Sequence, residues 1–221
     1  MGSLVKTYIF LDLEATGLNG QHPKIMELCL VAVHVSSLKN PKTSDSGEVQ
    51  LPRVLDKLCL CVNPDKPITQ IASEITGLDN DLLSSCEKEK FDMCLINTII
   101  EFINRQAQPV CLVAHNGFNY DFPLLKTELL QQNNDLSSSI MCVDTLQAFR
   151  YLHKKGEQRM EYVKGQFSLP KIYHQLFGKE PNFSHYAEGD VLTLILVFIC
   201  KVDSLLEVAN YKRWGEITPM Y

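Results

Sequence analysis

The chain has 221 residues, of which 45% are hydrophobic and 21% are charged, a composition typical of a globular domain with a sizeable core. The length fits one large domain or two small ones, and because we find no internal repeat or low-complexity linker we expect one domain over residues 1–221. The net charge of −5 argues mildly against a nucleic-acid partner, and the longest apolar run, residues 191–200, is too short for the roughly 20 residues of a membrane span.

The first part of the chain predicts strands that follow one another directly. Residues 7–14 and 25–35 are apolar runs typical of buried strands, and residues 55–63 alternate between apolar and polar side chains as a half-buried strand does. The polar segment 36–53 between them is predicted as an exposed loop.

The second part predicts alternating helices and strands. Helices are expected at 91–106, 119–132, 168–178 and 187–208, strands at 110–115 and 140–146, and a flexible charged loop at 153–165. This order predicts an α/β fold: a mixed central β-sheet, antiparallel at its start and then built from βα units, with helices flanking it.

Asp12 and Glu14 interrupt the first apolar strand, in the stretch FLDLEATGL. Side chains alternate along a strand, so both carboxylates point to the same side, about 6–7 Å apart. A buried carboxylate must be protonated, paired or bound to a metal. Two of them at this spacing can hold a pair of divalent cations, although a strand end in water would explain them equally well.

Three further residues in the second half could join the pair. Asp121 is expected in the first turn of a helix, where an acid can also serve simply as a partner of the helix dipole. Asp190 is expected in the first turns of the last helix, on a mostly apolar side that points to the core. His185 precedes it by five residues and could accept a proton from water near neutral pH.

Taken together, the pattern is Asp-x-Glu, a separate Asp, and His-x4-Asp. Acids from three elements with one histidine fit two-metal hydrolysis of a phosphodiester, in which cations neutralise the phosphate and activate water. Sequence motifs for other catalytic classes are missing: the sequence has no GxSxG, no Walker loop and no HExxH.

These residues resemble the DEDD-type 3′→5′ exonucleases that use a catalytic histidine. The blocks FLDLEATGL, ITGL, VAHNGFNYDFPLL and HYAEGD follow the order of that superfamily. The likeness extends over nearly the whole chain to the three-prime repair exonuclease family, through the segments LPRVLDKL, ASEITGL and the terminal PMY. Within that family, the chain most resembles the shorter, second paralogue.

The resemblance implies a ribonuclease H-like fold and a metal-dependent exodeoxyribonuclease that removes nucleotides from DNA 3′ ends, single-stranded or mispaired. It implies two Mg²⁺ ions, for which Mn²⁺ can substitute, and a homodimer joined through sheet edges. The metal ligands would be Asp12, Glu14, Asp121 and Asp190, with His185 as general base. The residues in contact with the 3′-terminal nucleotide would be Glu14, Ala15, Leu18, Ile75, Tyr120 and His185.

A cluster of cations could bind the DNA backbone and so offset the negative net charge. Its members lie in or beside the expected charged loop: Arg150, Lys154, Lys155, Arg159 and Lys164. A merely solvated loop remains an alternative for them. Two divalent cations at the acid cluster would further weaken the objection from net charge.

Two other functions remain open at this stage. An exoribonuclease could use the same carboxylates, because discrimination of RNA from DNA depends on contacts to the 2′-hydroxyl. A catalytically inactive nucleic-acid-binding module is a second alternative, which an intact set of costly acids disfavours.

The eight cysteines include no CxxC pair, so we expect reduced thiols and a nuclear or cytoplasmic protein that is neither secreted nor membrane-bound.

Overall fold

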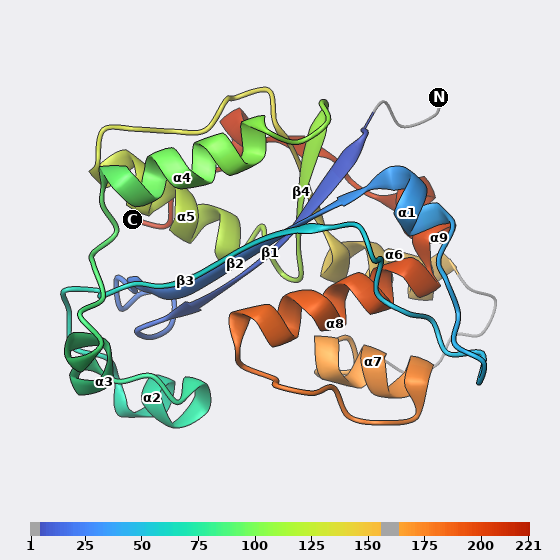
Figure 1. The fold of residues 1–221 in the computed structure, drawn as a ribbon, viewed down its shortest axis with the longest axis horizontal. Coiled ribbons are helices and arrows are strands. Elements are labelled where there is room, and N and C mark those ends of the chain that lie inside the picture. The colour runs from blue at the N-terminus through green and yellow to red at the C-terminus, as the bar shows by residue number, and fades with distance from the viewer. Residues whose placement is uncertain (1–4, 156–163) are drawn as a thin grey trace.

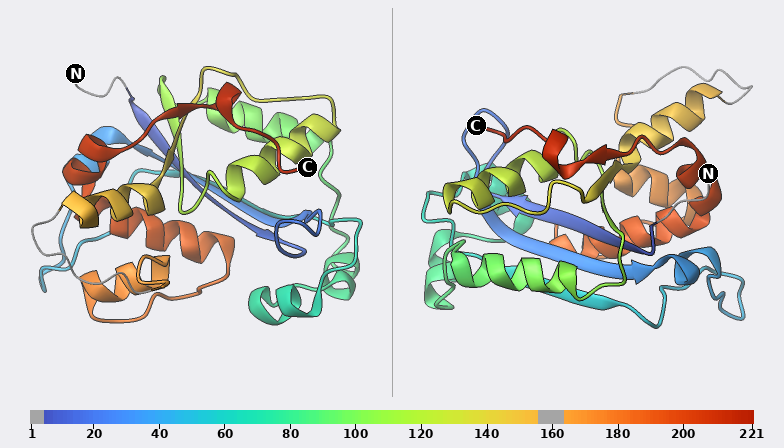
Figure 2. Two further views of the ribbon diagram at one scale, coloured as in Figure 1. Left: turned by 180° about the vertical axis from the view of Figure 1, so that it is seen from behind. Right: turned by 90° about the horizontal axis from the view of Figure 1, so that it is seen from above.

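A mixed sheet crosses the molecule, with helices on both of its faces (Figures 1 and 2). The computed structural model describes residues 5–155 and 164–221. The sheet has six strands in the order β3-β2-β1-β4-β5-β6. Their bounds are β1 Thr7–Ala15, β2 Ile25–His34, β3 Asp56–Cys61, β4 Val110–Ala114, β5 Met141–Asp144 and β6 Lys212–Arg213.

Strand directions match the predicted mixed sheet. β1 and β3 both run antiparallel to β2, whereas β4 is parallel to β1 and to β5. The short β6 closes the far edge antiparallel to β5. The sheet is therefore antiparallel in its first half and parallel in its centre, as consecutive strands followed by βα units require.

The helices divide between the two faces of the sheet. Their bounds are α1 Val35–Lys39, α2 Gln70–Thr76, α3 Asn80–Ser85, α4 Met93–Asn104, α5 Asp121–Gln131, α6 Thr145–Lys155, α7 Leu169–Phe177, α8 Ala187–Cys200 and α9 Val202–Val208, with a 3₁₀ turn at Trp214–Glu216. α4 and α5 lie together on one side of the sheet, and α7 and α8 lie on the other (Figure 1).

Alternation along β1 creates two hydrophobic cores. Ile9 and Leu11 belong to the core beneath α4 and α5, and Tyr8 and Phe10 to the core beneath α8. All four side chains are fully buried. Burial of a large apolar side chain contributes about 1.5–3 kcal/mol, so β1 is fixed from both sides, and its next even-numbered residue, Asp12, faces α8.

The structure confirms the predicted strands and the main helices but corrects several local expectations. The segment 36–53 begins with helix α1 rather than loop. α6 occupies 145–155, where the sequence predicted the end of a strand and the start of a flexible loop. The predicted helix 187–208 is two helices, separated at Lys201, whose φ of −131° is not helical.

Short elements account for what the sequence patterns did not predict. α2 and α3 have one to two turns each, too few for a periodic pattern, and side chains that precede them stabilise both: Thr69 accepts from the backbone N–H of Ala72, and Asp79 from that of Leu82. The two residues of β6 and the 3₁₀ turn after it were also not predicted.

Candidate active site

β1 delivers two acids to one end of the sheet, on the face covered by α8. Asp12 and Glu14 are both partly buried, and their β1 neighbours Leu13 and Ala15 are buried in the opposite core. The two carboxylates thus point the same way, as the strand alternation predicted. The pairing of β1 with β2 becomes irregular between Glu14 and Ala15, at the point where the strand leaves the acids.

The loop after β1 forms one wall of a pocket of about 370 Å³ beside these acids. Leu18 on this loop is 72% exposed, and Ile75 of α2 is 49% exposed. The hydroxyl of Tyr120 donates to the carbonyl of Gly17 at 2.6 Å and so ties the loop to the start of α5. The pocket lining includes every predicted nucleotide contact: Glu14, Ala15, Leu18, Ile75, Tyr120 and His185.

The start of α8 brings His185 and Asp190 to the same place. The backbone N–H of His185 donates to Oδ2 of Asp190 at 2.9 Å, and His185 has a left-handed φ of 66°. The segment before α8 packs closely against the helix at Gly189. A Cβ at this position would lie only 2.1 Å from the carbonyl oxygen of Phe183, so a side chain would not fit there. The ligand atoms of Glu14, His185 and Asp190 all lie within 4.8 Å of one another.

Asp121 is the first residue of α5 and is only 4% exposed. Its pKa is raised to about 7, first by burial, with Asp144 adding to the rise and backbone hydrogen bonds, its own amide's among them, opposing it. A helix N-terminus alone would stabilise the carboxylate, so burial outweighs the favourable position. Asp121 is therefore more than a dipole partner on the surface.

Mutual repulsion and burial make the acid cluster hard to ionise. The pKa of Asp12 is raised well above its ordinary value, by burial and then by Asp121, Asp190, Glu14 and Glu27. The pKa of Glu14 is raised to about 8, by burial, Asp190, Glu27 and Asp121. Burial also raises the pKa of Asp190, against the stabilising backbone N–H and charge of His185.

This donor set fits a divalent cation. Hard carboxylate oxygens are the ligands that Mg²⁺ and Mn²⁺ prefer. The acids repel one another in a partly desolvated site, and a cation would remove that repulsion and restore their ionised forms. Without a cation, protonation is the other way to relieve the repulsion that Asp12 and Glu14 experience from their acidic neighbours.

Two acids near the site were not singled out from the sequence. Glu27 on β2 pairs in register with Glu14, and its Oε2 accepts from the backbone N–H of Ala187 at 2.9 Å. Asp144 at the end of β5 accepts from the backbone N–H groups of Asn116 and Phe118 and thereby shapes the turn before Asp121. Both interrupt apolar strands, which is the same signal that identified Asp12 and Glu14.

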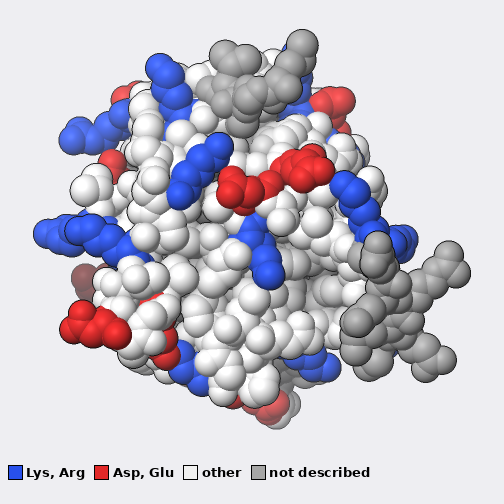
Figure 3. Space-filling view, turned by 90° about the vertical axis from the view of Figure 1, so that its right-hand side faces the viewer, with Lys and Arg blue, Asp and Glu red and all other residues white. Residues whose placement is uncertain are grey.

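The predicted basic cluster is only partly a loop. Arg150, Lys154 and Lys155 lie on helix α6, and Lys155 forms an ion pair with Glu207 at 3.2 Å. Lys164 is exposed just before α7, whereas Arg159 lies outside the described residues. On the face seen in Figure 3, Lys and Arg side chains are scattered among acidic ones rather than gathered in a continuous basic surface.

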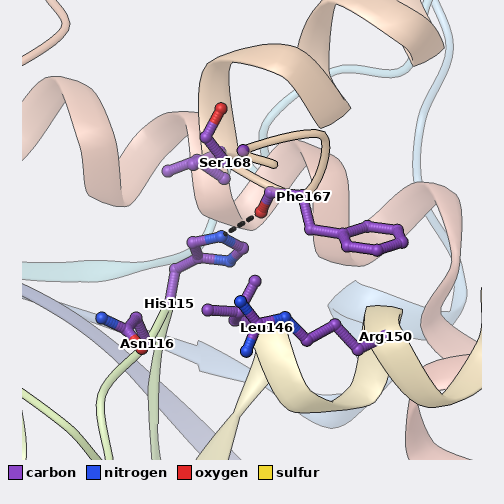
Figure 4. A pocket seen from close by; sticks show the side chains of 8 residues that line it. His115, Asn116, Leu146, Arg150, Phe167 and Ser168 are labelled. Atoms are coloured by element: carbon purple, nitrogen blue, oxygen red, sulfur yellow. Dashed lines mark hydrogen bonds between the residues drawn. The ribbon is translucent and has the colours of Figure 1, made fainter. Parts of the chain in front are cut away.

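Arg150 lines a separate pocket of about 290 Å³ together with His115, Asn116, Phe167 and Ser168 (Figure 4). Burial lowers the pKa of His115 to about 4, so its imidazole is neutral at physiological pH. Its Nε2 donates to the carbonyl of Phe167 at 2.8 Å, which connects the end of β4 to the segment before α7. Arg150 thus faces a concave surface beside His115, whereas Lys155 lines a different pocket together with Glu207.

Known proteins resemble this chain over nearly its whole length. A family model described as exonuclease matches residues 9–198. Three prime repair exonuclease 2 of Mus musculus is 48% identical over 98% of this chain and 93% of the relative. Three-prime repair exonuclease 1 of Homo sapiens is 43% identical over 98% of this chain and 71% of the relative.

Solved structures of similar fold are more distant in sequence. The nuclease domain of 3′hExo, a DEDDh family member bound to rAMP, has a TM-score of 0.69 at 13% identity and covers 96% of this chain and all of that chain. Escherichia coli exonuclease I in complex with a dT13 oligonucleotide has a TM-score of 0.64 at 15% identity, covering 89% of this chain and 41% of that one. At these identities the likeness concerns the fold, which is the predicted ribonuclease H-like one.

Among the described residues, no helix is long and apolar enough to cross a membrane. The family match and the relatives above 40% identity agree with each other and with the acid cluster on β1, α5 and α8. The chain therefore belongs to the three prime repair exonuclease family and is a 3′→5′ exonuclease.

Proposed function

We propose that this exonuclease removes nucleotides from 3′ ends of DNA by a reaction that depends on Mg²⁺. The observation that supports this most directly is the convergence of Glu14, Asp190 and His185 within 4.8 Å, beside the partly buried Asp12 and the buried Asp121. The adjoining pocket of about 370 Å³ has the size of a small-ligand site, and Glu14 and His185 belong to its lining.

The four acids Asp12, Glu14, Asp121 and Asp190 would hold the cations, two in number by analogy with other phosphodiester hydrolases, and Mn²⁺ could replace Mg²⁺. When bound, such ions neutralise the phosphate, lower the pKa of water and stabilise the leaving oxygen. The acids come from β1, α5 and α8, so the folded sheet itself fixes their spacing.

His185 would accept the proton of the attacking water. Its backbone is held by Asp190 while its side chain is exposed at the pocket, which leaves the imidazole accessible to solvent and substrate. A base in this position needs only to be neutral and within hydrogen-bond reach of the water.

The terminal nucleotide would lie in the pocket between Leu18 and Ile75. These exposed apolar side chains can contact the base, and Tyr120 borders the pocket from the α5 side. Glu14 and Ala15 also line this pocket. Exposed apolar groups around a concave surface are typical of ligand sites rather than of ordinary protein surface.

The test is degradation of 5′-labelled DNA and RNA oligonucleotides of the same sequence, single-stranded and with a mispaired 3′ end. We expect shortening from the 3′ end in Mg²⁺, none in chelator, and faster degradation of DNA. The matched control is Asp190→Asn, which should bind DNA without cutting it. Faster degradation of RNA would favour the exoribonuclease alternative, and DNA binding without Mg²⁺-dependent cleavage by the wild type would favour an inactive binding module.

Arg150 and its neighbours would contact the DNA backbone away from the reaction centre. The pocket of Arg150 is concave and carries a permanent positive charge, which suits a phosphate. Lys154 and Lys164 are exposed nearby in sequence, whereas Lys155 already has an acidic partner in Glu207. Lys155 is therefore expected to contribute less to binding than the other cations of the cluster.

A homodimer is the assembly we propose, with β3 as the contact. β3 is an edge strand whose Cys59 is exposed and whose Leu60 is 37% exposed. An open edge of this kind offers unpaired backbone groups to a second copy. Light scattering on a size-exclusion column should give the mass of a dimer, and Leu60→Lys on the edge should shift it toward the monomer; a wild-type monomer mass would refute the assembly.

We expect the protein in the nucleus or the cytoplasm. All eight cysteines are free thiols in the structure, and three of them, Cys59, Cys86 and Cys94, are exposed. Exposed free thiols suit a reducing compartment. Imaging of a tagged full-length chain in cells tests this, and a signal from the secretory pathway would contradict it.

A further inference from the structure

Glu27 is a charged residue beside the acid cluster that takes no part in the chemistry proposed above. It lies on β2, half-buried, and pairs in register with Glu14 on β1. Like charges directly opposite each other on antiparallel strands destabilise the pair. Burial and Glu188 raise the pKa of Glu27, although a hydrogen bond from Ala187 opposes the rise. A glutamate at this position is therefore costly.

The carboxylate of Glu27 makes a stabilising hydrogen bond at the start of α8. Oε2 of Glu27 accepts from the backbone N–H of Ala187, the first residue of that helix, at 2.9 Å. The first N–H groups of a helix have no partner inside the helix. The residue before α8, Tyr186, makes no side-chain capping bond in the described structure. Glu27 thus supplies the cap from another element, and its charge also favours the helix N-terminus.

An irregularity of the strand pairing lies at the same point. Glu14 pairs with Glu27, but the next residue, Ala15, pairs with Ile25, so Met26 is an extra residue on β2. Such a bulge bends its strand and redirects the neighbouring side chains. Here it lies where β2 passes the acids and faces the beginning of α8, next to the residue that caps this helix.

Two groups of the proposed reaction flank the capped residue. His185 precedes Ala187 by two positions and Asp190 follows it by three, and the two are joined by the bond from the His185 N–H to Asp190 Oδ2. Their ligand atoms lie within 4.8 Å of Glu14, which is carried by the strand next to Glu27. The hydrogen bond from Ala187 to Glu27 is therefore a direct link between the sheet and the part of α8 that completes the site.

We propose that Glu27 is a positioning residue, which holds the first turn of α8 so that Asp190 and His185 remain in place against Glu14. The proposal rests on the proposed roles of Asp190 and His185. Glu27 acts as a hydrogen-bond acceptor rather than as a cation ligand, because its Oε2 is engaged by the backbone N–H of Ala187.

The acceptor and the charge can be separated by substitution. Glu27→Gln keeps an oxygen that can accept from Ala187 and removes the charge, whereas Glu27→Ala removes both. Glu188→Gln is the matched control, because Glu188 binds Lys57 of β3 at 2.8 Å from the same turn of α8 but is half-exposed and not next to Glu14. The readouts are kcat, KM for a 5′-labelled oligonucleotide, the Mg²⁺ concentration for half-maximal rate, and the melting temperature in chelator.

We expect Glu27→Ala to lower kcat and raise the half-maximal Mg²⁺ concentration by about 10- to 100-fold, the range for residues that orient metal ligands. KM should change little, because the nucleotide pocket is intact. Glu27→Gln should restore both values to within about threefold of wild type, the small remainder being the missing charge at the helix terminus, and Glu188→Gln should match wild type. A lower melting temperature alone would not reproduce this selective rescue.

Three results would overturn the proposal. Wild-type kcat and Mg²⁺ dependence in Glu27→Ala would show that the cap is dispensable. An equal defect in Glu27→Gln and Glu27→Ala would assign the effect to charge, as for a ligand. If Glu27→Ala does not fold, Glu27→Asp takes its place, because its shorter side chain moves the acceptor away from Ala187. Wild-type kcat and Mg²⁺ dependence in Glu27→Asp would then overturn the proposal. A wild type that fails to cleave in Mg²⁺ would instead refute the proposed function, and Mg²⁺-induced shifts in melting temperature would still decide the role of Glu27.

Discussion

At the residue scale, the site is defined by acids placed where they are unfavourable in the free protein. The pKa of Glu14 is raised to about 8 and that of Asp121 to about 7, both mainly by burial. A folded-state pKa above the unfolded value means that the stability contributed by the group is present below the unfolded pKa and is lost as pH rises through the folded one. The cluster thus destabilises the metal-free protein most at neutral and alkaline pH.

Neutralising one acid should therefore stabilise the metal-free protein. We expect Glu14→Gln in chelator to raise the free energy of unfolding by about 1–4 kcal/mol at pH 8, the range for relief of buried charge, and by little at pH 5, where the carboxyl is already protonated. Thermal or urea melts at both pH values measure this. Mg²⁺ should reverse the order by stabilising the wild type alone, and a variant less stable than wild type at pH 8 in chelator would contradict the assignment.

Removal of a proposed ligand should abolish activity without unfolding the chain. Asp12→Asn and Asp190→Asn each remove a negative donor while keeping the shape of the side chain. Cleavage of a labelled oligonucleotide should become undetectable, with circular dichroism unchanged. Asp203→Asn on α9 is a suitable control, since this exposed acid lies in a helix away from the cluster. Cleavage at the wild-type rate in either variant would refute its assignment as a metal ligand.

His185 should be needed for proton transfer and not for metal binding. His185→Ala should lower kcat by about 10²- to 10⁴-fold, the usual range for removal of a general base, while half-saturating Mg²⁺ stays near wild type. A variant that no longer responds to Mg²⁺ would instead show that His185 is a ligand, as its distance from Glu14 and Asp190 allows.

At the scale of elements, the long apolar strands could be predicted and the short capped helices could not. β1, β2 and β4 carry continuous buried runs, and the acids of β1 follow from strand alternation alone. α2 and α3 depend on single capping side chains, Thr69 and Asp79, which a periodicity search does not register. α6 begins directly at the end of β5, so the apolar pattern extends the predicted strand over its first two residues, Thr145 and Leu146.

Part of the site could be predicted, because an acid in an apolar stretch of sequence is easy to recognise. Asp12, Glu14, Asp121 and Asp190 stand out because each is an acid in an apolar context. Glu27 stands in the same context, in IMELCLV, but its partner is a backbone N–H 160 residues away, which only the folded chain brings near. The position of β2 beside β1 and beneath α8 is what gives Glu27 a role.

Helix α6 should act in DNA binding rather than in chemistry. The double variant Arg150→Ala, Lys154→Ala should weaken binding of single-stranded DNA and reduce the slope of log affinity against log salt by up to about 1.4, or about 0.7 for each phosphate that is no longer neutralised. Single-turnover rates at saturating enzyme should stay near wild type. Lys155→Ala, which breaks the pair with Glu207, is the control and should change binding less; a collapse of the single-turnover rate would place α6 in the active site.

At the scale of the whole molecule, the sheet brings distant segments to one end. Residue 12 on β1, residue 121 on α5 and residue 190 on α8 meet because β1 is central, with α5 and α8 packed from opposite faces (Figure 2). The two hydrophobic cores stabilise the fold enough to tolerate the free-energy cost of the acids that lie between them. Mg²⁺ would then add stability to the fold that the acids have weakened, which couples the integrity of the site to the ion it uses.

The central claim is that this acid cluster binds the catalytic cation, and calorimetric titration of Mg²⁺ at pH 7 in buffers of different ionisation enthalpy tests it most directly. Because the raised pKa values of Glu14 and Asp121 keep them partly protonated in the free protein, binding should release about one proton or more per chain. Asp12→Asn should neither bind tightly nor release protons. Binding by Asp12→Asn with wild-type affinity, or binding to the wild type without proton release, would contradict the claim.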